Sequence, residues 1–343
     1  MRKLLNTLYV TIPGAYLARD GENVLVKIDN VVKFRIPVHN LEGIVTFGFT
    51  GASPGLMQLC CERGVTISFL TEYGKFMGRV TGKISGNIYL RKAQYKWSED
   101  EQITLRLASR FRSAKIINSR SVLHRAIRDH PQDVDKELLT DSMRKLAMLA
   151  KNLGDVKDLS TLRGLEGQAA FIYFRSFDQL VLSQKEEFSM TERNRRPPLD
   201  RINALLSFLY SLLTHETVAA LESIGLDPQS GFLHRDRPGR YSLALDIMEE
   251  LRPHFADRLA VTLMNRNQIK SDGFVLKENG AVVMDDETRK GVLLAWQKRK
   301  QEEIIHPFLE EKVSFGLVPY IQAMLLARHI RGDLDDYPPF FWK

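Results

Sequence analysis

One stretch of the sequence, residues 231–253, combines the side-chain types that phosphate chemistry with a divalent metal requires. His234 lies near its start, and Arg235, Arg237 and Arg240 follow in a basic loop that leads into an acidic segment. Carboxylate oxygens are the ligands that Mg²⁺ and Mn²⁺ prefer, and one imidazole is compatible with them. Guanidinium groups can donate paired hydrogen bonds to phosphate oxygens. The stretch therefore predicts a metal site beside a bound phosphate.

The acidic residues of this stretch fall on one side of a predicted helix over 241–251. At about 100° per residue, Asp246, Glu249 and Glu250 share a face opposite the apolar side chains. Asp246 and Glu249 are close to one turn apart, so their carboxylates project toward a common point. An ordinary amphipathic surface helix has the same pattern with its carboxylates in water, and the helix alone favours neither interpretation.

Another candidate carboxylate, Glu166, lies between two glycines in the sequence Gly164-Leu165-Glu166-Gly167. Glycine makes a helix less stable than alanine does, and it permits another backbone or a ligand to come close. The flanking glycines make Glu166 a candidate site residue. A glutamate near a frayed helix start is the alternative, which this segment alone slightly favours.

Composition indicates an ordinary folded protein whose charge suits a polyanionic partner. The 343 residues are 44% hydrophobic and have a formal net charge of +7, so nucleic acid is a reasonable partner and a merely basic protein is the alternative. Cys60 and Cys61 are adjacent, which argues against a disulfide framework or a thiolate metal site, and we predict both to be buried and reduced. The most apolar run, 204–213, is too short to span a bilayer. We therefore expect no membrane association and a cytoplasmic or nuclear location.

Apolar periodicity predicts an α+β multidomain protein, with a small N-terminal β domain in residues 1–90 and a larger all-α catalytic domain in residues 101–343. A linker is expected over 91–100. In the first domain Asp20-Gly21 is a hairpin signal, and a helix over 53–63 should be capped by Ser53 and ended by Gly64. Strands are predicted over 5–12, 16–17, 23–28, 31–38, 41–49, 65–70 and 76–80, the last two on either side of Tyr73-Gly74.

The first predicted helix of the second domain, 101–129, is a positive rod. It has no acidic residue between Gln102 and Arg128, whereas helices that need only solubility usually mix charges. Neutralising phosphates would release counterions, so we favour contact with DNA over a solvated face. Its basic residues are Arg106, Arg110, Arg112, Lys115, Arg120, Arg125 and Arg128.

Further helices are predicted over 133–152, 159–174 and 201–213, the last of them a core helix that starts at Asp200. Residues 186–196 should be a loop, in which Arg195 and Arg196 either line a nucleic-acid path or solvate the loop. His215 is expected to be structural or solvated rather than a ligand.

Three motifs together resemble the signature of one family, the CRISPR-associated spacer-acquisition integrases, known as the universal adaptation nuclease. The resemblance covers essentially the whole chain, including 195–198, 203–207 and 263–266, and the segment 332–340 looks most like the subtype labelled I-C. The motifs are Gly164-Leu165-Glu166-Gly167, Gly231-Phe232-Leu233-His234 and Ser242-Leu243-Ala244-Leu245-Asp246-Ile247-Met248-Glu249-Glu250-Leu251-Arg252-Pro253.

The resemblance implies a set of site residues. The family's metal-binding glutamate matches Glu166, its histidine matches His234, and its acidic helix pair matches Asp246 and Glu249, with Glu at the second position where some members have Asp. We expect Glu166, His234 and Glu249 to bind Mg²⁺ or Mn²⁺ directly. Asp246 should be a ligand or orient the ligands, and Glu250 should face solvent.

The resemblance also implies an activity and partners. A metal would activate the 3′-hydroxyl of a captured DNA fragment, or a water, for attack on a phosphodiester, which inserts foreign fragments into a CRISPR repeat array in antiviral defence. Expected partners are DNA fragments, the CRISPR repeat, branched DNA, a second copy bound through the β domain, and a small second CRISPR-associated adaptation protein. The residues expected to hold DNA phosphates without reading bases are Arg235, Arg237, Arg240, Arg106, Arg110, Arg195 and Arg196.

Two other functions stay open. One is a stand-alone metal-dependent nuclease for branched DNA, which would cut without joining. The other is a non-catalytic DNA-binding scaffold whose acidic helix is only solvated.

Overall fold

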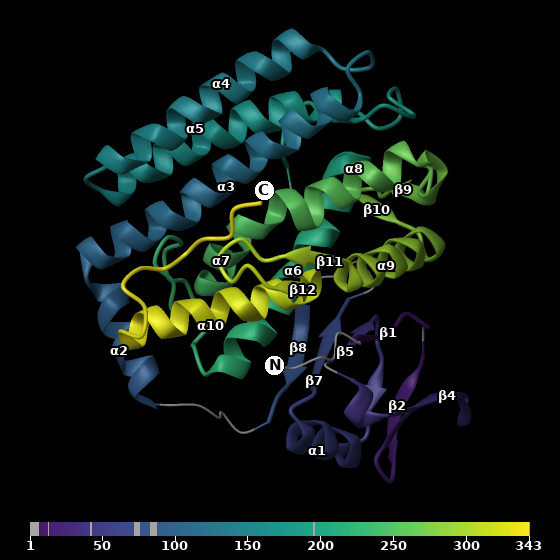
Figure 1. Cartoon of the computed structure of the whole chain (residues 1–343). Coiled ribbons are helices and arrows are strands. Elements are labelled where there is room, and N and C mark those ends of the chain that lie inside the picture. Colours follow the sequence, from purple (N-terminus) through teal and green to yellow (C-terminus); the bar gives the residue numbers. More distant parts are fainter. Residues whose placement is uncertain are drawn as a thin grey trace. The chain divides into compact units, whose positions relative to one another are not determined.

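The computed structural model describes residues 7–12, 14–41, 43–71, 76–82, 88–194 and 196–342, and the chain divides into two compact units (Figure 1). The first contains Met1–Ser85 and Arg289–Glu302, and the second contains Gly86–Thr288 and Glu303–Lys343. A strand-rich N-terminal region precedes a largely helical one, which confirms the predicted α+β class.

The first unit contains two four-stranded sheets. Its strands are β1 (Thr7–Val10), β2 (Tyr16–Asp20), β3 (Asn23–Ile28), β4 (Val31–Pro37), β5 (Gly43–Phe47), β6 (Gly51–Ala52), β7 (Thr66–Leu70) and β8 (Phe76–Val80). The sheet orders are β1-β5-β7-β8 and β4-β3-β2-β6. Strands β2 and β3 form the predicted antiparallel hairpin, with Asp20 opposite Asn23. Residues 5, 6, 73 and 74 of the predicted strand region lie outside the described residues.

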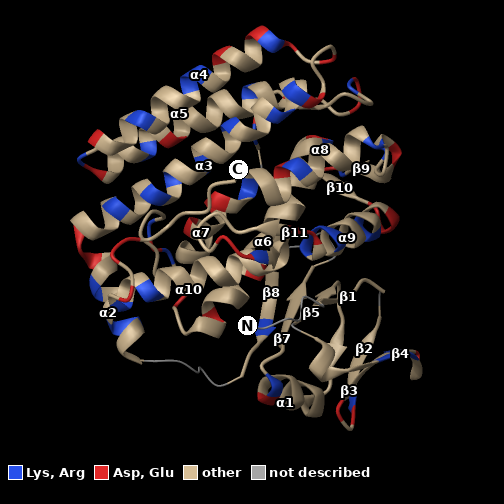
Figure 2. Ribbon diagram, in the orientation of Figure 1, with Lys and Arg blue, Asp and Glu red and all other residues tan. Residues whose placement is uncertain are grey.

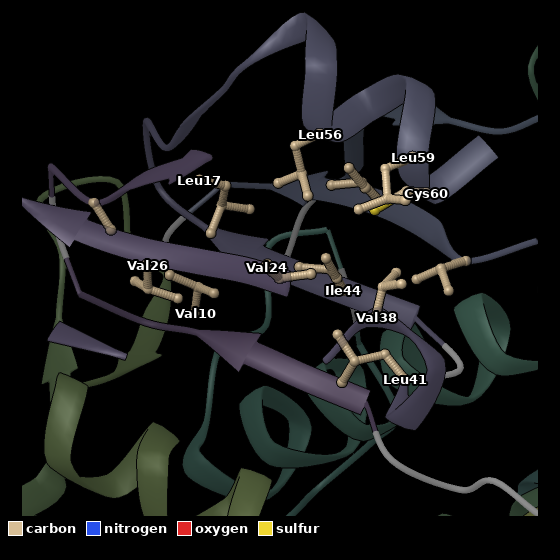
Figure 3. Close-up of a cluster of buried hydrophobic side chains, with 13 residues drawn as sticks. Val10, Leu17, Val24, Val26, Val38, Leu41, Ile44, Leu56, Leu59 and Cys60 are labelled. Carbon is tan, nitrogen blue, oxygen red and sulfur yellow. The ribbon is translucent and has the colours of Figure 1, made fainter. Parts of the chain in front are cut away.

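Helix α1 (Pro54–Arg63) has the predicted ends. Ser53 Oγ accepts a hydrogen bond from the Leu56 amide at 3.3 Å. Gly64 ends the helix at φ 68°, a left-handed conformation that glycine adopts without steric cost. The helix covers the first unit's core, because its buried face packs with apolar residues of the strands (Figure 3).

The two cysteines have different environments. Cys60 is fully buried in this core, and burial, with Cys61 as the next cause, raises the pKa of the Cys60 thiol to about 12. Cys61 is partly exposed. Both are free thiols. The prediction of burial is therefore confirmed for Cys60 and wrong for Cys61, which lies about 100° further round α1 and is partly exposed.

The second unit is mainly helical. Its helices are α2 (Ile88–Glu99), α3 (Glu101–Asp129), α4 (Lys136–Asn152), α5 (Leu159–Phe177), α6 (Arg201–Ile224), α7 (Ser242–Arg252), α8 (Arg258–Asn265) and α10 (Val318–Arg331); α9 (Asp286–Gln301) belongs mostly to the first unit. Two strand pairs are β9 (Phe274–Leu276) with β10 (Val282–Met284), and β11 (Glu303–Ile305) with β12 (Lys312–Ser314). The segment 91–100, expected as a linker, is instead largely the helix α2.

Aspartates begin several of these helices. The carboxylates of Asp100, Asp158 and Asp200 accept backbone N–H groups in the first turns of α3, α5 and α6. Such caps satisfy amides that have no partner within the helix. Since α3 and α5 bear residues of the candidate site, these local signals help to set where those residues lie.

Helix α6 is longer than predicted. It continues beyond Leu213 to Ile224, so the expectation that this apolar segment is too short to cross a membrane was wrong. By length and composition it is the one candidate span among the described residues, but 67% of its most apolar window is buried in the protein. Leu205, Leu209 and Leu212 are nearly inaccessible, which confirms the predicted core helix. His215 lies in the same core at 9% exposure.

The last described segment, after α10, packs against the helices of the second unit, to which it belongs (Figure 1). Tyr337 and Phe340 are each 1% exposed. The Asn118 side-chain amide on α3 donates to the backbone oxygens of Glu250 and Phe340, both at 2.8 Å, and its Oδ1 accepts from the Trp342 amide. One buried amide thus joins α3, α7 and the chain segment after α10.

Candidate metal and nucleic-acid site

Three helices of the second unit bring two of the predicted carboxylates together. Glu166 lies on α5 and Glu249 on α7, and α3 lies against both helices. Lys115 Nζ on α3 is 2.8 Å from Glu166 Oε1 and 2.8 Å from Glu249 Oε2. Arg112 Nη1 is 2.9 Å from Glu166 Oε1 and 3.6 Å from Glu249 Oε2. Both carboxylates therefore face the same two cations.

His234 faces Glu249 with one ring nitrogen and Asp246 with the other. Its Nε2 is 3.9 Å from Glu249 Oε1, and its Nδ1 is 2.6 Å from Asp246 Oδ1. A proton on Nδ1, donated to the carboxylate, leaves a lone pair on Nε2 toward Glu249. Metal-binding histidines in proteins are commonly oriented by such a carboxylate.

Asp246 is a fully buried acceptor. Its Oδ2 accepts the amides of Phe232 at 2.7 Å and Leu233 at 3.0 Å, and its Oδ1 accepts the His234 amide at 3.0 Å in addition to the ring. The approach of this loop requires Gly231, because a Cβ there would lie 2.8 Å from Asp246 Oδ2. Four donors occupy its two oxygens, so Asp246 fits the predicted orienting role better than the role of a direct ligand.

Cations keep both candidate ligands ionised. Burial alone raises the pKa of Glu249, but Arg252, Lys115 and Arg112 outweigh burial and hold that pKa well below its usual value. Burial also opposes ionisation of Glu166, and Lys115 and Arg112 again lower its pKa. Arg252 donates to Glu249 Oε1 at 2.7 Å. Two anionic carboxylates beside an imidazole are donors of the types that Mg²⁺ or Mn²⁺ accepts.

The donors fit such a metal in type, although a lysine ammonium lies between them. Among the described residues, no three His, Cys, Asp or Glu side chains are grouped closely enough to hold an ion. The Lys115 ammonium lies between Glu166 and Glu249 and contacts both carboxylates. A cavity of about 260 Å³ lies next to Lys115 and Glu166, with Tyr173, Tyr210, Arg252 and Asp257 also in its wall.

The expectation for two cations of α3 was wrong, and a third cation of the site was missed. Arg112 and Lys115 were expected on a DNA-facing rod, but Arg112 is 3% exposed and both face the carboxylates. A spacing signal was available: Ala108, Arg112, Lys115 and Ser119 recur at helical spacing, and the small residues at both ends indicate a packed stripe. Arg252, which holds Glu249, was not singled out.

Glu250 does not face solvent as expected. Its side chain is fully buried, and Oε2 accepts the Phe340 amide at 2.7 Å and Gln322 Nε2 at 2.9 Å. Burial raises the pKa of Glu250 to about 8. The physical reason for the error is that residues after α10 cover this side of α7, which helical periodicity within α7 cannot reveal.

The predicted DNA-contact arginines differ in exposure. Arg106 and Arg110 are exposed on α3, along which Figure 2 shows several basic positions, and Arg110 pairs with Asp336. Arg196 is exposed, whereas Arg195 lies outside the described residues. In the loop before α7, Arg235 and Arg237 are exposed and Arg240 is partly buried.

Arg163 is a further basic residue that sequence reasoning missed. Its Nη2 donates to the Leu233 backbone oxygen at 3.2 Å, next to His234. Burial, and then Arg235, lower the pKa of Arg163, so a second cation lies near it. Its position three residues before Glu166 on α5 was the available signal.

The chain is similar to known proteins over its whole length. The model of the family described as CRISPR associated protein Cas1 matches residues 8–298. CRISPR-associated endonuclease Cas1 1 of Chlorobaculum tepidum is 51% identical over 343 residues, which are 100% of each chain.

Two solved structures share the fold. One is a casposase bound to an integration product, with a TM-score of 0.82 and 24% identity, covering 98% of this chain and 92% of that chain. The other is a chain of a Cas6-RT-Cas1–Cas2 complex, with a TM-score of 0.81 and 24% identity, covering 98% of this chain and 36% of that chain.

Proposed function

The chain belongs to the Cas1 family of CRISPR-associated endonucleases, and from this we propose that it inserts captured DNA fragments into a CRISPR repeat array with a metal held by Glu166, His234 and Glu249. The observation that supports the site assignment is that Glu166 on α5 and Glu249 on α7 share Lys115. His234, in the loop before α7, lies 3.9 Å from Glu249 and is bonded to Asp246. Mg²⁺ or Mn²⁺ would supply polarisation of the attacking and leaving oxygens.

The protein's own residues prepare this chemistry. Asp246 orients His234 so that Nε2 faces the ligand position, and Arg252 fixes one oxygen of Glu249. Glu166 and Glu249 remain anionic because three cations surround them. The attacking group would be a 3′-hydroxyl in integration or a water in nuclease activity, with a phosphodiester as the target in both.

DNA would bind through its backbone. Arg106 and Arg110 on α3 and Arg235 and Arg237 before α7 are exposed cations of the same unit as the site. Phosphate contacts position DNA without reading its sequence, which suits an enzyme that accepts fragments of many sequences. The integration product bound by the casposase is consistent with a DNA partner for this fold.

Two protein partners follow from the family. One is a second copy of the chain, held through the β-rich unit, and the exposed edge strand β4 supports this part of the proposal. Val31, Val32 and Phe34 of β4 are 56%, 47% and 47% exposed, and in its sheet order β4 pairs only with β3 among the described strands. Exposed apolar edge strands are surfaces that need cover.

The other partner would be a small second adaptation protein of the Cas2 type, as in the complex that contains a chain of this fold. The motif at 332–340 supports assignment to subtype I-C. A cytoplasmic location fits action on cellular DNA, and α6 is a buried helix.

Strand transfer tests the proposed function. Short duplexes with 3′-hydroxyl ends and a repeat-bearing plasmid would be incubated with the protein, its small partner and Mn²⁺ or Mg²⁺. Joined products should form, and Glu166→Ala or His234→Ala should abolish them, whereas Glu137→Ala, an exposed glutamate on α4, should not. Cutting without joining would favour a branched-DNA nuclease. DNA binding without metal-dependent chemistry would favour a non-catalytic scaffold.

A further inference from the structure

Lys115 occupies the space between the two carboxylates that we assign as metal ligands. Its ammonium is 2.8 Å from an oxygen of each, so one cation bridges α5 and α7. Glu166 and Glu249 would otherwise repel each other across a mostly buried centre, where like charges interact strongly. Lys115 therefore does for the protein alone part of what a metal would do.

Counting charges shows that this centre needs no further positive group. The two carboxylates contribute two negative charges, and Arg112, Lys115 and Arg252 contribute three positive ones through contacts of 3.6 Å or less. The buried carboxylate of Asp246, which holds His234 beside Glu249, offsets the third positive charge, so a divalent cation would add two positive charges to a centre whose charges already balance. Entry of the metal is favoured only if a resident cation withdraws or an anion arrives with it.

Lys115 is the resident cation best able to withdraw. The Arg112 side chain is 4% exposed, and the Arg252 guanidinium lies 4.9 Å from the Tyr210 ring centroid while it donates to Glu249. The side chains of Lys115 and Arg252 are both 14% exposed and both line the cavity of about 260 Å³, so the type of cation and its partners distinguish them. An ammonium on a four-carbon stem also changes position more easily than a planar guanidinium with several partners.

We propose that Lys115 is a placeholder cation that couples metal binding to DNA binding. It holds Glu166 and Glu249 together in the metal-free protein, withdraws when a divalent cation enters, and then donates to a phosphate of bound DNA. By thermodynamic reciprocity, DNA that receives the withdrawn ammonium strengthens metal binding, and metal strengthens DNA binding. This inference rests on the proposed function and adds a positioning residue with a regulatory consequence.

Manganese affinity in the absence of turnover tests the proposal. Free Mn²⁺ would be followed by electron paramagnetic resonance during titration of the full chain, with and without a duplex whose 3′ ends lack the hydroxyl. Wild type should bind Mn²⁺ on the order of tenfold more tightly with DNA. Lys115→Met should bind Mn²⁺ on the order of tenfold more tightly than wild type without DNA, and DNA should then add little.

Two further variants separate charge from size. Lys115→Arg keeps the cation but withdraws less easily, so it should bind Mn²⁺ no more tightly than wild type without DNA. Arg120→Met removes an exposed cation of the same helix and should leave DNA-free Mn²⁺ affinity at the wild-type value. If Lys115→Met does not fold, Lys115→Gln replaces it, with the same result expected because the charge is again lost.

Thermal unfolding gives a second measurement. In a chelator, Lys115→Met should unfold at a lower temperature than wild type. Mn²⁺ should then raise the unfolding temperature of Lys115→Met by more than it raises that of wild type. Unchanged Mn²⁺ affinity in both uncharged variants, or an undiminished effect of DNA, would overturn the placeholder role. Glu166→Gln separates the proposed metal site from the proposed role of Lys115. If Glu166→Gln abolishes Mn²⁺ binding while the Lys115 variants behave as wild type, the metal site is supported and the coupling through Lys115 is refuted. If wild type does not bind Mn²⁺ in the presence of DNA, both the metal site and the role of Lys115 are refuted.

Discussion

His234 Nδ1 and Asp246 Oδ1 lie 2.6 Å apart, and the same aspartate accepts the backbone amides of residues 232–234. The imidazole and the loop that bears it are thus attached to one buried carboxylate on α7. Glu249 lies on the same helix, so a shift of α7 would move the histidine and the glutamate together.

Replacing Asp246 by asparagine should weaken the site without removing a predicted ligand. An amide has one acceptor oxygen, so its NH₂ group would face a backbone N–H or the histidine ring. We expect Asp246→Asn to reduce Mn²⁺ affinity by about 10- to 100-fold, with a comparable loss of strand transfer. Titration with Mn²⁺ measures this. Asp236→Asn, on the exposed part of the loop, is the control, and equal affinities for the two variants would contradict the orienting role.

Removal of Arg112 should destabilise the metal-free protein. Its guanidinium is buried against Glu166 and Glu249, and deleting one partner of a buried ion pair costs about 3–5 kcal/mol. Arg112→Met should therefore lower the unfolding temperature in a chelator, and Mn²⁺ should restore part of the loss by neutralising the carboxylates. Calorimetry in chelator and in Mn²⁺ would measure both effects. Arg106→Met, exposed on the same helix, should have little effect on stability.

The buried carboxyl of Glu250 should make stability depend on pH. Burial raises its pKa to about 8 in the folded protein from an ordinary value of 4.5, so the folded state binds the proton more tightly. Its stabilisation is complete below pH 4.5 and is lost as pH rises toward about 8. Glu250→Gln cannot ionise and keeps an acceptor for the Phe340 amide. Relative to wild type, the variant should gain on the order of a few kcal/mol in unfolding free energy between pH 5 and 8.5.

Denaturant unfolding at several pH values tests this expectation. Glu137→Gln, which changes an exposed glutamate, should follow the wild-type curve. Parallel curves for wild type and Glu250→Gln would show that the Glu250 carboxyl has the same pKa in the folded and unfolded protein.

Exposed arginines should govern the salt dependence of DNA binding. We expect Arg106→Ala and Arg235→Ala each to weaken binding equally for different sequences, and each to reduce the slope of log affinity against log salt by about 0.9. Fluorescence anisotropy with two unrelated duplexes at several salt concentrations provides the slopes. Arg144→Ala, on α4 and paired with Asp141, is the control. A loss confined to one duplex would indicate base reading instead.

Local signals predicted where α5 and α6 begin, because a helix cap acts over a few residues. Asp158 and Asp200 cap their helices within three positions. Ser53 and Gly64 do the same for α1. Glu166, His234 and Glu249 were selected from short motifs by family resemblance. Glu166 and Glu249 contact the same lysine and His234 lies 3.9 Å from Glu249, while their role as metal ligands stays a prediction.

Long-range packing decided what the sequence could not indicate. From the sequence, Arg112 is predicted to be one more surface cation of a positive helix. In the structure, α5 and α7 place two carboxylates against it. Glu250 is predicted to face solvent, but the amide of Phe340, 90 positions later, donates to its carboxylate. In both residues the environment comes from segments far away in the sequence, where periodicity within one helix carries no information.

The bond from Phe340 to Glu250 also has a consequence for biosynthesis. A ribosome that adds about 5–20 residues per second reaches position 340 roughly 5–20 s after position 250. During that interval the buried carboxyl of α7 lacks the Phe340 amide, and Asn118 lacks the backbone oxygen of the same residue. The helix that bears Glu249 thus acquires its contacts with Phe340 late in translation, so a nascent chain does not yet hold the complete candidate site.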